Sequence, residues 1–168
     1  MTLKPFQAGL TAEEWRRFWE SFRDPEIAEW NGNKPLKTPL WLFKRIIMGE
    51  VRRGERMGFV VLDENGEWLG TLEFYNLENK QADLGIILGR KDRWGQGYGR
   101  EAVRAALEYV FGRLGLEKVY LTTFAHNERA RRAFEAAGFR EFGSRLLPGR
   151  KLDIIMVATP DSLKRPDE

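Results

Sequence analysis

Three glycines at alternate positions, Gly95, Gly97 and Gly99, form the segment of this chain whose residue types and spacing best suit a chemical role. They separate a predicted strand from a predicted helix, where the missing side chains let a ligand reach the backbone amides. Arg100 lies in the first helical turn, where a cation opposes the helix dipole, and a bound polyphosphate would compensate for that cost. The segment therefore predicts an anion site; a glycine-rich loop on a basic surface is the alternative. More positive charge precedes the turn at Arg90, Lys91 and Arg93.

The spacing of this turn differs from two common phosphate-binding motifs. A dinucleotide-binding fingerprint needs glycine where Arg100 stands. A P-loop needs Gly-Lys followed by Ser or Thr, which this segment lacks. The spacing thus excludes both nucleotide-binding motifs as the source of the anion site.

Capping patterns and periodicity predict the elements that position this turn. Thr11 to Glu14 has the spacing of a capping box, which predicts a helix to about Arg23. Asp24 before Pro25 predicts a second, short helix. Further helices are expected over about 39–48, 99–114 and 127–137, and strands over 59–62, 68–75, 81–88, 118–124, 140–144 and 152–158. A polar tail, expected to fray, covers 161–168.

Length and composition limit the classes of protein that this chain can be. Its 168 residues suit one domain, which we place at 1–160, and 42% hydrophobic with 32% charged residues is typical of a globular chain. The absence of cysteine excludes a disulfide framework, a thiolate metal site and a cysteine nucleophile. We expect no metal site of another kind.

The N-terminus and the net charge bear on location and partners. The first ten residues lack the pattern of a signal peptide, and no stretch approaches the roughly 20 apolar residues that span a bilayer, so we expect a cytoplasmic protein without a membrane partner. The net charge of +3 is small for this length. Nucleic-acid binding is therefore not required to explain it.

Two separated motifs resemble the signatures of the GNAT superfamily of N-acetyltransferases. Gly97 and Gly99 match its coenzyme motif, Gln/Arg-x-x-Gly-x-Gly/Ala, and Trp94 stands at the first position. Trp94 and the Asp-Pro-Glu sequence at 24–26 resemble the branch that acetylates the N-termini of ribosomal proteins. The second superfamily signature is similar to a downstream pattern, Asn127-x-x-Ala130-x-x-x-Phe134-x-x-x-Gly138-Phe139.

The resemblance covers about residues 3–158 and implies a fold and a reaction. The implied fold is α/β (α+β): a central, mostly antiparallel mixed sheet of about seven strands, splayed between strands 4 and 5 and flanked by helices. The implied enzyme transfers an acetyl group from acetyl-CoA to a primary amine by direct attack in a ternary complex, with a protein N-terminal amine favoured and a small-molecule amine as the alternative. The coenzyme would lie between the strands that contain Ile87 and Tyr120. Its implied contacts are Leu88, Arg93, Trp94, Gly95, Gln96, Gly97, Tyr98, Gly99, Arg100, Asn127, Arg131 and Phe134.

Two carboxylates are candidates for the base, because the attacking amine must first lose a proton. Asp83 interrupts a predicted strand near a position where the family often has a glutamate. A hairpin turning around Glu78 would place Glu73 directly opposite Asp83, and two like charges raise a carboxyl pKa. The alternative is that both are solvated surface residues. The family's thiolate-protonating tyrosine is replaced by Phe134, which leaves water, Tyr75 or Tyr120 as the acid.

The acceptor site is expected between the N-terminal helices and the final hairpin, near 145–150. Trp30 and Asn31, at the start of a Gly- and Asn-rich loop, are the predicted substrate residues. By resemblance, a homodimer is a candidate assembly. A non-catalytic acyl-CoA-binding module on the same fold is the alternative function. A nucleic-acid-binding domain is a further one, although the basic residues after 128 alternate with acidic ones, as on a solvated face.

Overall fold

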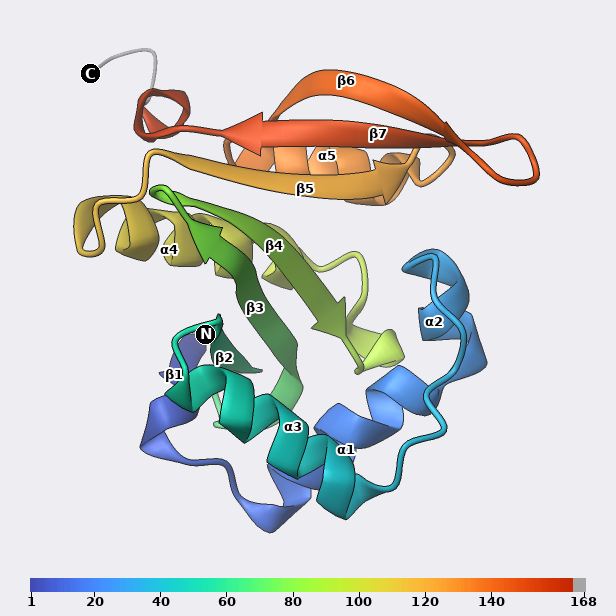
Figure 1. Cartoon of the computed structure of the whole chain (residues 1–168), viewed down its shortest axis with the longest axis vertical. Coiled ribbons are helices and arrows are strands. Elements are labelled where there is room, and N and C mark those ends of the chain that lie inside the picture. The colour runs from blue at the N-terminus through green and yellow to red at the C-terminus, as the bar shows by residue number, and fades with distance from the viewer. Residues whose placement is uncertain (165–168) are drawn as a thin grey trace.

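The protein folds around one seven-stranded sheet with the strand order β1-β2-β3-β4-β5-β7-β6 (Figure 1). The computed structural model describes residues 1–164. The strands are β1 Thr2–Pro5, β2 Arg56–Leu62, β3 Trp68–Glu78, β4 Gln81–Leu88, β5 Lys118–Phe124, β6 Arg140–Leu147 and β7 Lys151–Ala158. The helices are α1 Ala12–Arg23, α2 Pro25–Trp30, α3 Leu40–Arg52, α4 Tyr98–Gly112 and α5 Glu128–Ala137, and short 3₁₀ turns cover Phe6–Ala8, Lys91–Arg93 and Pro160–Leu163.

The predicted splay between strands 4 and 5 is confirmed. Strands β4 and β5 are parallel and paired only at Gln81, Ala82 and Asp83 of β4, while the other neighbouring strands are antiparallel. Beyond this short ladder the two strands diverge, and Figure 1 shows the opening between them. The sheet is therefore of the mixed, mostly antiparallel kind that the sequence predicted.

Helices cover both faces of the sheet and bury two apolar clusters. Val103, Leu107 and Val110 of α4 belong to the larger cluster, which includes Leu72 and Phe74 of β3. The smaller cluster joins α1 and α3 to the sheet through an aromatic group. Its buried members are Phe6, Trp15, Phe18, Phe43, Ile47, Val51, Val60 and Trp68. Of the tryptophans in α1, Trp15 is thus a core residue.

Several boundaries differ from the predicted ones because tertiary pairing extends the elements. The edge strand β1 was not predicted: it pairs with β2 from Thr2↔Leu62 to Pro5↔Phe59, and four residues are too short to show a period. Helix α3 continues to Arg52, and β2 begins at Arg56 rather than at Phe59. The closing hairpin is also longer, with a turn of only three residues between Leu147 and Lys151.

The start of the C-terminal tail is ordered, so the prediction that it frays from Asp161 onward was wrong there. Thr159 caps the 3₁₀ turn Pro160–Leu163, Leu163 packs against the larger cluster, and Arg104 Nη2 donates to the Leu163 carbonyl at 2.7 Å. The rest of the predicted tail, 165–168, lies outside the described residues. Within 1–164, no helix is long and apolar enough to cross a membrane.

Candidate functional site

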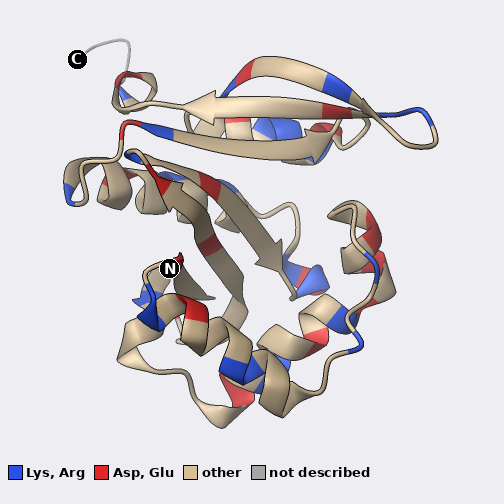
Figure 2. Ribbon diagram, in the orientation of Figure 1, with Lys and Arg blue, Asp and Glu red and all other residues tan. Residues whose placement is uncertain are grey.

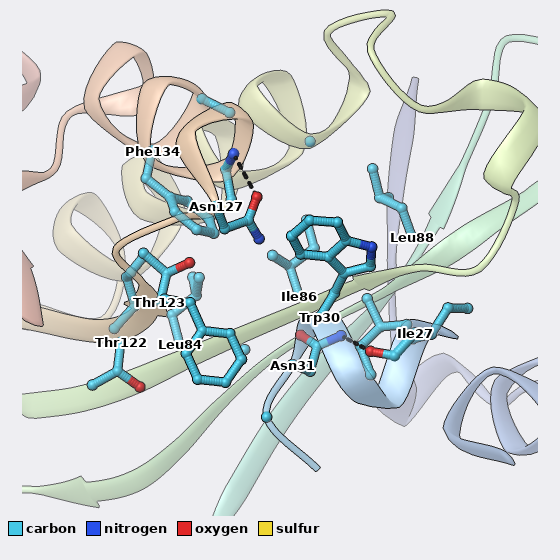
Figure 3. Close-up of a pocket in the computed structure, with 18 of the residues that line it drawn as sticks. Ile27, Trp30, Asn31, Leu84, Ile86, Leu88, Thr122, Thr123, Asn127 and Phe134 are labelled. Atoms are coloured by element: carbon cyan, nitrogen blue, oxygen red, sulfur yellow. Dashed lines mark hydrogen bonds between the residues drawn. The ribbon is translucent and has the colours of Figure 1, made fainter. Parts of the chain in front are cut away.

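The splay between β4 and β5 opens into a cleft with a volume of about 710 Å³. Residues 84–88 of β4 form one wall, and residues 121–124 of β5 form the other. The start of α4 and one face of α5 close one end, while Trp30 and Asn31 at the end of α2 lie over the opening. Figure 3 shows these segments around the cleft. Thr71, Glu73 and Tyr75 of β3 also line the cleft, as do Arg56 of β2 and residues of the β6–β7 hairpin.

The glycine turn at 95–99 presents backbone amides to this cleft. Gly95 and Gly97 have φ values of 78° and 88°, which non-glycine residues rarely adopt, and Gly97 is the N-cap of α4. No side chain caps this helix, and the amides of Tyr98, Gly99 and Arg100 precede the first intrahelical hydrogen bond. The start of α4 thus has free donors and the positive end of the helix dipole, which fit a pyrophosphate.

The three basic residues before the turn have other partners, which corrects the predicted source of positive charge. Arg90 pairs with Glu67 and Asp92, Lys91 with Asp24 and Glu26 of the α2 region, and Arg93 with Asp63. In Figure 2 the blue segment beside the tip of β4 faces the red residues of α2. Among the described residues, Arg100 has no carboxylate within ion-pair distance. The turn therefore relies on its amides and Arg100.

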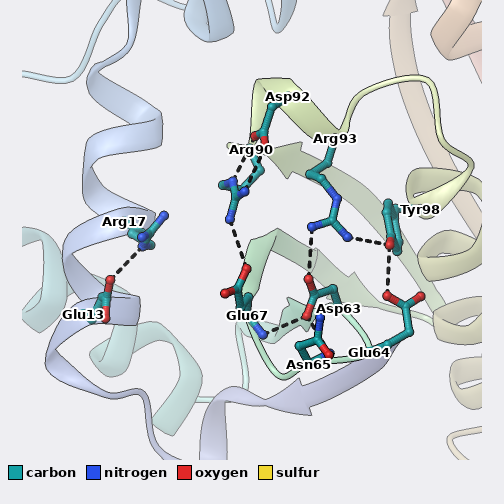
Figure 4. Close-up of polar contacts among 10 residues, drawn as sticks. All are labelled: Glu13, Arg17, Asp63, Glu64, Asn65, Glu67, Arg90, Asp92, Arg93 and Tyr98. Carbon is teal, nitrogen blue, oxygen red and sulfur yellow. Dashed lines mark hydrogen bonds and ion pairs between the residues drawn. The ribbon is translucent and has the colours of Figure 1, made fainter.

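Asp63, which sequence reasoning missed, ties the β2–β3 turn to the glycine turn (Figure 4). One carboxylate oxygen accepts from the amides of Asn65 and Glu67 at 2.8 and 2.9 Å, and the other accepts from Arg93 at 3.1 Å. Arg93 also donates to the Tyr98 hydroxyl at 2.6 Å. Asp63 is 2% exposed, so it acts as a buried anchor that positions the first residue of α4 through Arg93.

We expect Asp63→Asn to raise the KM for acetyl-CoA by about three- to tenfold with little change in kcat, because the charged bond to Arg93 weakens. The pKa of Asp63 is held below its usual 3.8, first by the Glu67 amide and then by the Asn65 amide and Arg93. A lowered pKa stabilises the fold above 3.8, and this stabilisation is lost as the pH falls below it. Thermal melts should show a Tm gap between wild type and variant at neutral pH that closes in acid; a constant gap would contradict this role.

The remaining predicted coenzyme residues divide into two groups. Leu88, Trp94, Asn127 and Phe134 line the cleft together with the turn. The Trp94 indole donates to the Leu88 carbonyl at 2.7 Å, and Asn127 caps α5 by accepting from the Ala130 amide at 3.3 Å. Gln96 and Arg131 are absent from the lining: their side chains bond to the carbonyls of Asp92 and Ala125, and Arg131 also pairs with Glu141.

The predicted pairing of Glu73 with Asp83 was wrong by two residues. Glu73 lies opposite Gly85, and Asp83 lies opposite Tyr75, because the hairpin turns at Asn79–Lys80 and its ladder shifts between Tyr75 and Glu78. The two carboxylates share a face of the sheet but are diagonal neighbours. Asp83 is placed where β4 still pairs with β5, at the closed end of the splay, and it is bonded by Asn76 Nδ2 at 2.7 Å.

Glu73 is buried on the cleft wall, and its carboxylate has two unlike oxygens. Oε2 pairs with Arg56, which also pairs through Nε with Glu50 at 2.6 Å. Oε1 is buried and has no hydrogen-bond partner among the described residues. Burial raises the pKa of the Glu73 carboxyl, and Arg56 opposes that rise. An unpartnered basic oxygen at a cleft is what a proton acceptor for an amine requires.

The end of the cleft beside α2 and the β6–β7 hairpin brings the predicted Trp30 and Asn31 together with Phe124 and Asp153, which the sequence did not single out. The Asn31 side chain donates to the Ile27 carbonyl at 2.8 Å and thereby stabilises the end of α2. Asp153 of β7 is buried at the cleft and is bonded by Arg145 of β6. Phe124 lines the same end and stacks on His126, with 5.2 Å between ring centroids. Arg145 and Asp153 lie together because they are opposite each other in the register of β6 and β7, so their spacing in the sequence gave no signal.

Comparisons with known proteins agree with this geometry. A family model described as an acetyltransferase (GNAT) domain matches residues 2–140. A spermidine N(1)-acetyltransferase of Vibrio cholerae is 32% identical over 87 residues, which is 51% of this chain and 50% of that protein. An uncharacterised N-acetyltransferase of Bacillus licheniformis is 28% identical over 58% of this chain and 57% of its own length. The matches thus span about half the length of these curated relatives.

Solved structures extend the likeness to the whole fold. The spermidine N-acetyltransferase of Vibrio cholerae, in complex with CoA and spermine, has a TM-score of 0.84 at 22% identity and covers 96% of both chains. The structure of AAC(6')-Ib in complex with ribostamycin and coenzyme A has a TM-score of 0.78 at 20% identity; the match covers 100% of this chain and 99% of that one.

Proposed function

The chain belongs to the GNAT acetyltransferase family, and we propose that it transfers the acetyl group of acetyl-CoA to a primary amine, with Glu73 as the base. The residues present fit the coenzyme: free amides at the start of α4 suit its pyrophosphate, and the splay between β4 and β5 suits its extended arm. Acetyl-CoA supplies the activated acyl group.

The observation that carries the proposal is the unpartnered Oε1 of Glu73 at the cleft wall. An acceptor amine enters as an ammonium, and Glu73, directly or through a water, takes its proton so that the neutral nitrogen can attack. Burial raises the pKa of the Glu73 carboxyl and makes it a stronger base than a solvated carboxylate, while Arg56 opposes that rise. Asp83 does not line the cleft, so we assign the base to Glu73 alone.

The departing thiolate needs a proton, and Phe134 cannot provide one. Phe134 lines the cleft and packs against Phe139 with 6.0 Å between ring centroids. Tyr75 also lines the cleft, and its pKa is raised by burial first and by the nearby carboxylates of Asp83 and Glu73 after it. A tyrosine with a raised pKa stays protonated at neutral pH. The raised pKa also makes the Tyr75 hydroxyl a weaker acid, so in this proposal water supplies the proton and Tyr75 is the alternative donor.

The acceptor that we favour is a protein or peptide N-terminal amine, entering past Trp30 and Asn31. The β6–β7 hairpin contributes Arg145, Leu147 and Asp153 to the cleft lining, so an extended chain can lie beside strand residues there. Solved relatives contain spermine and ribostamycin instead, so small polyamines and aminoglycosides are the competing acceptors.

A screen of thiol release from acetyl-CoA tests the proposal. We expect thiol release that depends on an added primary amine. We also expect CoA at 100 times its Kd to raise the free energy of unfolding by about 3 kcal/mol, which a thermal melt detects as a higher Tm. The alternative is a non-catalytic acyl-CoA-binding module on the same fold. It would show the thermal stabilisation without turnover for peptides, polyamines, amino acids or aminoglycosides.

A further inference from the structure

The charges at the acceptor end of the cleft indicate which class of amine it takes, an inference that rests on the proposed acetyl transfer. We propose that the acceptor is an amine with an anionic group close behind it, such as a peptide whose residues after the first are acidic. Polyamines and aminoglycosides, which carry several positive charges, are on this view poor acceptors for this chain.

The first observation concerns the carboxylates of the cleft. Among the described residues that line it, the acidic ones are Glu73 and Asp153. Both already have an arginine partner: Arg56 pairs with Glu73, and Arg145 Nε and Nη2 lie 3.1 and 3.0 Å from Asp153 Oδ2. A polycation that leaves water needs a counter-charge for each ammonium group it buries. This cleft has no unpaired carboxylate to spare for a second or third ammonium.

The second observation concerns the cations of the β6–β7 hairpin. In its register Arg145 lies opposite Asp153, and Leu147 lies opposite Lys151. Opposed residues, and residues two apart along a strand, share a face of the sheet, so Arg145 and Lys151 lie on one face. Lys151 Nζ lies 5.5 Å from the centroid of the Phe124 ring, which lines the cleft. Both cations thus stand at the acceptor mouth.

The N–H donors of Arg145 that do not contact Asp153 give this mouth its selectivity. Its side chain is 57% exposed, and Asp153 occupies only the Nε and Nη2 donors, so the other N–H groups can bind a second anion. Lys151 adds a point charge beside it. With the remaining donors of Arg145 and the ammonium group of Lys151 on its hairpin side, the mouth attracts anions and repels cations. An amine aimed at Glu73 is therefore bound best when an acidic group follows it.

Matched peptides test this with the wild-type protein. We would compare three peptides of one length with N-terminal alanine, differing only at the next two positions: glutamate, glutamine or lysine. The glutamate peptide is expected to have a kcat/KM about tenfold or more above that of the lysine peptide. Its advantage should shrink with added salt. Equal or better turnover of the lysine peptide, or of spermine, would overturn the inference while leaving acetyl transfer established.

A charge-removing variant and a matched control locate the effect. Arg145→Gln should reduce the preference for the glutamate over the lysine peptide to about threefold or less, a ratio that does not depend on the fraction of folded protein. Arg140→Gln removes the same charge from the far end of β6, opposite Val157, and should leave the ratio unchanged. An unchanged ratio in Arg145→Gln would refute the assignment to this residue. Absence of turnover with every amine would instead refute the proposed function.

Discussion

Replacing Glu73 with glutamine is expected to lower kcat by about 10²- to 10⁴-fold, the usual contribution of a positioned base, while the KM for acetyl-CoA changes little. The amide has nearly the shape of the carboxylate but cannot accept the proton of an ammonium at the orphan Oε1 position. Steady-state kinetics with one acceptor peptide would measure this effect.

The pH dependence separates loss of the base from a structural effect. Burial raises the pKa of Glu73 above the usual value of 4.5. The plot of kcat/KM against pH should therefore rise as Glu73 loses its proton, at a pH above that value. The Glu73→Gln variant should lack this rise. Asp83→Asn is the matched control, since Asp83 does not line the cleft, and it should stay within about threefold of wild type. A full-activity Glu73→Gln variant with an unchanged pH profile would eliminate Glu73 as the base.

Substituting alanine for Gly97 is expected to raise the KM for acetyl-CoA by about 10- to 100-fold, because small displacements of positioning groups cost that much. Gly97 has a φ of 88° at the N-cap of α4, so a side chain there costs about 1–2 kcal/mol and reorients the amides of the turn. The expected readout is weaker binding of CoA by calorimetry, with kcat reduced less than affinity.

A second glycine serves as the control for backbone strain. Gly115 has a φ of 69°, and a Cβ added there would meet nothing within 4 Å, as befits its position between α4 and β5 outside the cleft lining. Gly115→Ala should lower Tm to a similar extent as Gly97→Ala and leave the affinity for CoA unchanged. If both variants bind CoA like wild type, the glycine turn is not the pyrophosphate site.

The parts of the fold that the sequence predicted well are those with local physical causes. The capping box at Thr11 and the cap at Asp24 are present, and β4 and β5 have the predicted bounds. The register of the β3–β4 hairpin was predicted wrongly because Asn79 and Lys80 form the turn with positive φ values. Glycine is the usual sequence signal for such a turn, and it is absent here.

The residues of the candidate site can likewise be divided into those with local sequence signals and those placed by contacts between distant segments. The glycine turn could be found from spacing, because its residues are contiguous in the chain. Asp63 and Asp153 could not be found in this way, because their partners are distant in the chain. Asp63 pairs with Arg93, 30 residues away, and Asp153 pairs with Arg145, 8 residues away. Arg56 reaches Glu73 across a strand pair whose register the sequence leaves open. Pairing between strands and turns thus places these charged residues at the cleft or, for Asp63, behind the glycine turn.

Mass spectrometry of an acceptor peptide after incubation with acetyl-CoA and the wild-type protein tests acetyl transfer most directly. We expect one acetyl group on the N-terminal amine for each free thiol released, with both quantities strongly reduced in Glu73→Gln. A protein that CoA stabilises against heat, but that acetylates no peptide, polyamine, amino acid or aminoglycoside, would contradict the proposed enzyme and identify a coenzyme-binding module.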